Sequence, residues 1–186
     1  MLTKLDLTFR DITAHVEFLP QLPHLTVLHL DCSKDGGWST PADALLTSLL
    51  LCNGLTELNL TCGFKSAHWT ALFAQLAVKK LTIGRGSVET LSCFAGGPIT
   101  QTLEELTIES LDRGLKLPPS ELLHLYNLRS LRTLHLNNCF FPRLSDDAIG
   151  RLSPPTALLP ALTMFIYQWQ RTHCLERKGP AYCKRD

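Results

Sequence analysis

The sequence has almost no net charge. Its 18 lysines and arginines face 17 aspartates and glutamates, which leaves a formal charge of +1. Proteins that hold nucleic acid or an anionic membrane by electrostatic attraction carry a clear positive excess. The composition therefore argues against nucleic acid and against a membrane surface as partners.

Long hydrophobic runs are also missing. The longest apolar stretch, around residues 44–52, is interrupted by Thr47 and Ser48 and is far shorter than the roughly 18 residues of a membrane span. Lys4 and Asp6 lie where a signal peptide would have its apolar centre. We therefore predict no membrane segment and no secretion, and we expect a cytoplasmic or nuclear protein.

A short apolar pattern, L-x-x-L-x-L, recurs through the chain. Its copies begin at positions 2, 25, 55, 78, 103, 131 and 162, at an irregular spacing of 23 to 31 residues. Apolar and polar residues alternate in the last part of each copy, which is typical of a strand with one buried face. The apolar residues of the seven copies are Leu2, Leu5, Leu7; Leu25, Leu28, Leu30; Leu55, Leu58, Leu60; Val78, Leu81, Ile83; Leu103, Leu106, Ile108; Leu131, Leu134, Leu136; and Leu162, Phe165, Tyr167.

The segments between the copies carry helix signals. Helix-capping residues stand at 39–41 and at Ser66, Ser120 and Ser145, each before an apolar segment, whereas residues 95–98 are typical of a loop. Strands that alternate with helices pair in parallel with their neighbours along the chain. We therefore predict an α/β fold, with a curved parallel sheet of six or seven short strands and helices on its convex side.

Two stretches resemble a known family. C-N-G-L-T-E-L-N-L (52–60) and L-R-T-L-H-L-N-N-C (131–139) resemble the cysteine-containing leucine-rich repeat of F-box substrate adaptors. The resemblance implies a horseshoe-shaped solenoid over residues 1–170. Residues 171–186 have five basic and two acidic side chains and no strand pattern, and we interpret them as a basic tail. No F-box sequence precedes Leu2, so we expect either a fragment of a longer protein or an N-terminal edge that packs against a partner.

The seven cysteines are an odd number and are scattered through apolar segments, which favours a reducing compartment over a disulfide framework. Cys52 stands three positions before Leu55, where other copies of the pattern have leucine, so we interpret it as a packing residue. Cys32 and Cys62 share a position in adjacent copies, and a disulfide between them is sterically conceivable. The spacing of residues 173, 174 and 183, a histidine and two cysteines, does not match a zinc site. No metal is predicted.

The segment L-T-I-G-R-G-S-V-E-T-L (81–91) offers an alternative function, because two glycines follow a strand where a phosphate-binding loop would lie. Glu89 takes the place of the third glycine, however, and its carboxylate would repel a phosphate. The sequence also has neither an H-E-x-x-H nor a G-x-S-x-G motif. We therefore expect no enzyme and no cofactor, and we keep a nucleotide-binding protein or enzyme that uses Gly84–Glu89 as the alternative.

The polar residues that alternate with the leucines should form the concave face of the sheet. This face has five acidic residues and two lysines, so we expect it to bind a protein with a basic patch. The resemblance to F-box substrate adaptors implies that such a module would be a fragment of a ubiquitin-ligase substrate receptor. The predicted partner-binding residues are Asp6, His29, Asp31, Glu57, Asn59, Lys80, Thr82, Glu105, Thr107, Glu109, His135 and Asn137.

Overall fold

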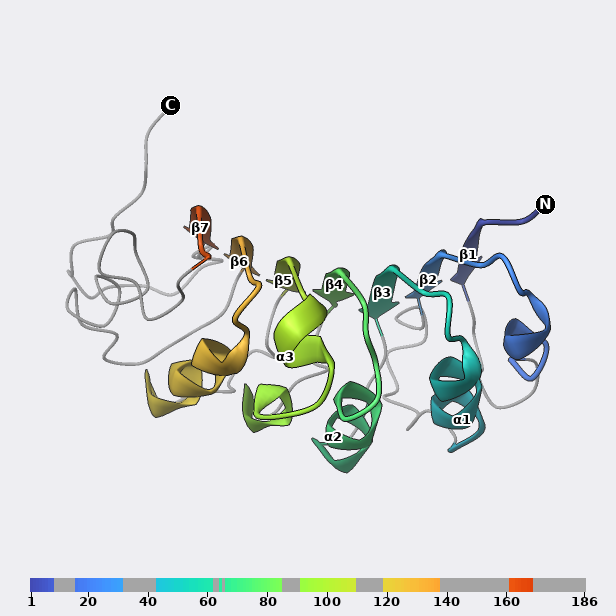
Figure 1. Cartoon of the computed structure of the whole chain (residues 1–186), viewed down its shortest axis with the longest axis horizontal. Helices are drawn as coiled ribbons and strands as arrows, with labels where there is room; N and C mark the ends of the chain where they lie inside the picture. The colour runs from blue at the N-terminus through green and yellow to red at the C-terminus, as the bar shows by residue number, and fades with distance from the viewer. Residues whose placement is uncertain are drawn as a thin grey trace, which may run out of the picture.

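The fold is built on seven short strands, one for each copy of the apolar pattern (Figure 1). The computed structural model of the chain describes residues 1–8, 16–31, 43–61, 64, 66–84, 91–109, 119–137 and 161–168. The strands are β1 (Lys4–Thr8), β2 (Val27–Asp31), β3 (Glu57–Thr61), β4 (Lys80–Ile83), β5 (Glu105–Glu109), β6 (Thr133–Asn137) and β7 (Met164–Gln168).

All seven strands belong to one parallel sheet, in which each strand pairs only with its neighbours along the chain. Equivalent positions of successive copies pair directly, so that Leu5 lies beside Leu28 and Leu28 beside Leu58. This register follows from the repeated pattern, because a shift by one residue would turn every leucine to the other face. The prediction of an α/β fold with a parallel sheet of six or seven strands is confirmed.

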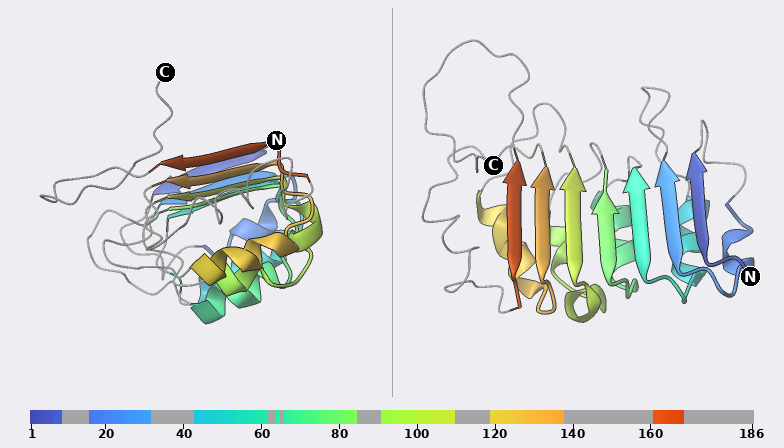
Figure 2. Two further views of the ribbon diagram at one scale, coloured as in Figure 1. Left: turned by 90° about the vertical axis from the view of Figure 1, so that its left-hand side faces the viewer. Right: turned by 90° about the horizontal axis from the view of Figure 1, so that it is seen from above.

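The helical segments that the structure describes all lie on one face of the sheet (Figure 2). None of the helices in the described ranges has the length and apolarity needed to cross a bilayer. The α-helices are α1 (Asp43–Leu51), α2 (Ser66–Phe73) and α3 (Ile99–Thr102), and the 3₁₀ helices are η1 (Leu19–Gln21), η2 (Leu91–Phe94) and η3 (Pro119–Asn127).

Two of the predicted helix starts can be compared with the structure. Helix α2 begins at Ser66, as expected. The segment expected to start at Ser120 begins one residue earlier and is a 3₁₀ helix of nine residues. Its buried leucines, Leu122 and Leu125, are three residues apart, which matches the three residues per turn of a 3₁₀ helix, and the buried Leu128 follows directly after its end. The segment after Ser145 lies outside the described residues.

The core lies between the sheet and the helices. Leucine and isoleucine side chains of β2 to β6 are almost completely buried there, and Trp69, Phe73 and Phe94 fill the helical layer. The rings of Phe73 and Phe94 stack at a centroid distance of 4.8 Å. Cys52 is buried in the same core, and its Sγ donates to the carbonyl oxygen of Ser48 over 3.1 Å. The interpretation of this cysteine as a packing residue is confirmed.

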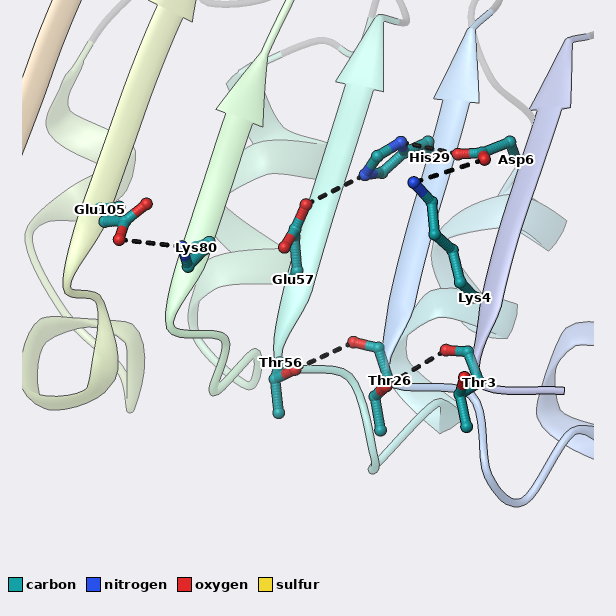
Figure 3. A network of polar contacts seen from close by, with 9 residues as sticks. All are labelled: Thr3, Lys4, Asp6, Thr26, His29, Thr56, Glu57, Lys80 and Glu105. Carbon is teal, nitrogen blue, oxygen red and sulfur yellow. Dashed lines mark hydrogen bonds and ion pairs between the residues drawn. The ribbon is translucent and has the colours of Figure 1, made fainter. Parts of the chain in front are cut away.

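A ladder of hydrogen bonds joins the segments that lead into the strands. The carbonyl oxygen of Thr3 accepts hydrogen bonds from the backbone N–H groups of Thr26 and Val27, and the same arrangement recurs up to β7. The hydroxyl of Thr26 adds a third bond to Thr3, and that of Thr56 does the same for Thr26, each at 3.1 Å (Figure 3). We refer to this arrangement as the threonine ladder, and it fixes the start of each strand relative to the previous one.

Candidate functional site

The open face, by which we mean the sheet face on which none of the described helices lies, carries the polar residues that alternate with the buried leucines. All twelve residues predicted to bind a partner lie on β1 to β6. The register brings them into three rows that cross the strands. The first row contains Lys4, Glu57, Lys80 and Glu105; the second Asp6, His29, Asn59, Thr82, Thr107 and His135; and the third Thr8, Asp31, Thr61, Glu109 and Asn137.

An imidazole bridges two carboxylates on this face. His29 Nδ1 lies 2.7 Å from Asp6 Oδ1, and His29 Nε2 lies 3.1 Å from Glu57 Oε1, so the contact spans β1, β2 and β3 (Figure 3). A neutral imidazole has one N–H group and can donate to only one of the two carboxylates, whereas the protonated ring donates to both. The histidine side chain is 28% exposed, so these contacts are partly shielded from water.

Two lysines pair with carboxylates of the same face. Lys80 Nζ lies 2.9 Å from Glu105 Oε1, and this hydrogen bond, with the negative charge of Glu105, raises the pKa of Lys80. Lys4 Nζ lies 3.6 Å from Asp6 Oδ2, in a looser contact (Figure 3). Three of the five acidic residues counted from the sequence, Asp6, Glu57 and Glu105, therefore face a lysine or a histidine.

A hollow lies over the C-terminal halves of β1, β2 and β3. It has a volume of about 190 Å³, and its floor is formed partly by Leu7 and Leu30. Polar side chains provide the rest of its lining: Asp6, Thr8, His29, Asp31, Asn59 and Thr61. Thr8 and Thr61 alternate with the leucines and so belong to this face, but they were not among the predicted partner-binding residues. The pattern of a single strand does not show which of its polar residues surround a hollow.

The other end of the open face is less charged. His135 lies on β6, four strands from His29, so the two histidines are too far apart to share a proton. Its Nε2 atom is buried and has no hydrogen-bond partner in the described structure. On the neighbouring β7, the apolar side chain of Met164 is 49% exposed.

The glycine segment that suggested nucleotide binding is only partly described, since residues 85–90 lie outside the described ranges. The N–H of Gly84 donates to the carbonyl oxygen of Leu60 over 2.7 Å. A side chain at this position would collide with the side chain of Thr61, so close packing between strands accounts for this glycine.

The other candidate sites fall mostly outside the described residues. Cys32, Cys62 and the group at 173–183 all lie there. Among the residues that the structure does describe, no group of three or more histidine, cysteine, aspartate or glutamate side chains has the arrangement of a metal site.

No protein-family model, curated protein or solved structure matches this chain. The evidence for a binding site on the open face and at its hollow is therefore the geometry of this chain alone.

Proposed function

We propose that this chain is a leucine-rich-repeat solenoid that binds a partner protein on the open face. The observation that carries the proposal is the sheet itself, in which seven parallel strands have one polar face that none of the described helices covers. Seven strands at about 4.8 Å span roughly 29 Å, which is enough for a protein interface of standard size. The threonine ladder and the buried leucines support a rigid surface, which keeps the entropy cost of binding low.

The acidic residues of the open face support a partner with a basic patch. The carboxylates of the first two rows face His29, Lys80 or Lys4. Asp31 and Glu109 add negative charge in the third row. Complementary charge favours association and orients the partner.

A binding role is better supported than a catalytic one. Both ring nitrogens of His29 are engaged by carboxylates, so neither is available as a general base for a substrate. The cysteine-containing pattern, with Cys52 in the core, supports the more specific proposal of a fragment of a ubiquitin-ligase substrate receptor.

Capture from a cell lysate with matched variants tests the proposal. Thr82→Arg places a bulky cation in the centre of the open face, whereas Gln75→Arg makes the same addition at an exposed position after α2. We expect Thr82→Arg to lose the captured protein and to weaken its measured affinity by about tenfold or more, with Gln75→Arg unchanged. Equal capture by both variants, at equal melting temperatures, would contradict binding on the open face.

A further inference from the structure

The hollow has room for the end of a long side chain. Its volume of about 190 Å³ is roughly six times the volume that one molecule occupies in liquid water. It opens onto the face where we propose that the partner binds. A partner that covers the sheet would therefore have to fill it with a side chain or leave it to water.

The lining of the hollow is rich in hydrogen-bond acceptors. Asp6 and Asp31 contribute carboxylates from adjacent strands, Asn59 contributes an amide oxygen, and Thr8 and Thr61 contribute hydroxyls. Among the lining residues that the structure describes, His29 is the one with a basic side chain, and its ring nitrogens already face Asp6 and Glu57. A group with several N–H donors and a positive charge complements this lining.

Lys4 indicates how a cation approaches the hollow. It reaches along β1 and brings Nζ to 3.6 Å from Asp6 Oδ2, the carboxylate oxygen that His29 does not contact (Figure 3). This distance is longer than a hydrogen bond, and the lysine side chain is 55% exposed. Such pairs contribute little to stability, so a better-placed cation can displace the lysine.

We propose that the hollow receives an arginine side chain of the partner protein, held by Asp6 and Asp31, with Lys4 as an internal competitor. This inference rests on the proposed function and adds to it the residue that the partner inserts. The planar guanidinium has five N–H donors and can serve carboxylates on two strands at once. A lysine ammonium has three donors around one nitrogen and fits the spread of acceptors less well.

A small peptide tests the hollow without knowledge of the partner. The ¹⁵N-labelled chain is titrated with acetyl-Gly-Arg-Gly-amide while amide shifts are recorded, and the same peptide with citrulline or lysine serves as comparison. We expect the arginine peptide to shift the amides of Asp6, Asp31 and Asn59, citrulline to have no effect, and lysine to bind more weakly. Equal shifts with citrulline, or shifts confined to other regions, would overturn the proposal.

Two pairs of variants separate the hollow from a general charge effect. Asp31→Asn should weaken arginine-peptide binding several-fold, whereas Glu17→Gln, at an exposed residue just before η1, removes the same charge without effect. Lys4→Gln should strengthen binding several-fold. Lys79→Gln should leave it unchanged, although Lys79 Nζ also lies 3.6 Å from a carboxylate, Glu104 Oε1. Equal responses within either pair would show that net charge alone matters.

Failure of this inference can be told apart from failure of the proposed function. If Thr82→Arg abolishes capture but the arginine peptide does not bind at the hollow, binding on the open face stands and the arginine site is wrong. If the arginine peptide binds at the hollow but Thr82→Arg captures as the wild type does, the arginine site stands and the proposed function is wrong.

Discussion

The hydroxyl of Thr56 donates a hydrogen bond of 3.1 Å to the carbonyl oxygen of Thr26, although 30 residues separate the two along the chain. The same carbonyl oxygen accepts the backbone N–H groups of Thr56 and Glu57, so three donors converge on one acceptor. The contact lies at the start of β3, where the chain leaves the segment after α1 and enters the sheet. It links two consecutive strands where their pairing begins.

Replacing Thr56 by valine removes this hydroxyl and keeps the branched shape of the side chain. We expect the free energy of unfolding to fall by about 1 kcal/mol, because one net hydrogen bond is lost. Urea denaturation followed by circular dichroism measures the change. Thr82→Val is the control, since the hydroxyl of Thr82 makes no hydrogen bond within the described structure. A loss of the same size in both variants would mean that the hydroxyl of Thr56 contributes no more to the free energy of unfolding than that of Thr82.

Two adjacent glycines before α3, Gly96 and Gly97, should respond differently to replacement by alanine. Gly97 has a φ of 85°, and a Cβ at this position would collide with the carbonyl oxygen of Phe73. Gly97→Ala should therefore destabilise the protein by at least about 1–2 kcal/mol. Gly96→Ala should be neutral or slightly stabilising, because nothing lies within 4 Å of its added Cβ. Thermal unfolding of the two variants measures the difference, and equal melting temperatures would contradict the expected order.

A carboxylate joins two of the 3₁₀ helices. The backbone N–H of Leu91, at the start of η2, donates to Glu121 Oε2 in η3 over 2.8 Å. Glu121→Ala leaves this donor without its acceptor, and we expect a loss of about 1–3 kcal/mol in unfolding free energy. Glu121→Gln keeps an acceptor oxygen at the same reach and should cost less. Chemical denaturation compares the two, and the reverse order would refute the assigned contact.

The stability of the protein should depend on alkaline pH through Cys93. Burial, aided by the negative charge of Glu121, raises the pKa of this thiol to about 12 from its ordinary value of 9.0. Above pH 9 the unfolded chain releases the proton that the folded chain retains, so the stabilisation present below pH 9 is lost as pH rises toward 12. The slope is at most about 1.4 kcal/mol per pH unit.

Cys93→Ala isolates this effect. The other cysteines titrate alike in both proteins, so the difference between the two curves of unfolding free energy against pH belongs to Cys93. We expect the wild type to lose stability faster than the variant above pH 9, measured by urea denaturation at several pH values. Parallel curves would indicate that the thiol is less shielded than its 4% exposure implies.

The sequence predicted the strands well because their signal is local. Each L-x-x-L-x-L copy shows which residues must be buried, and the same spacing in every copy leaves only one register that buries them all. The open face followed directly, because side chains alternate along a strand. Helix η3 was harder to predict, since the expected start at Ser120 also suits an α-helix, and the 3₁₀ geometry depends on packing of Leu122 and Leu125 against the core.

The sequence by itself determined the order of the strands, the buried leucines and the set of polar residues that share the open face, because these depend on a repeated local pattern. Only the tertiary structure decided which charged groups pair. Glu57 lies directly beside Lys80 in the register, yet it contacts His29 on the other side, while Lys80 turns to Glu105. Each charge has several neighbours within reach across a sheet, and the choice among them depends on rotamers and on the positions of all the others.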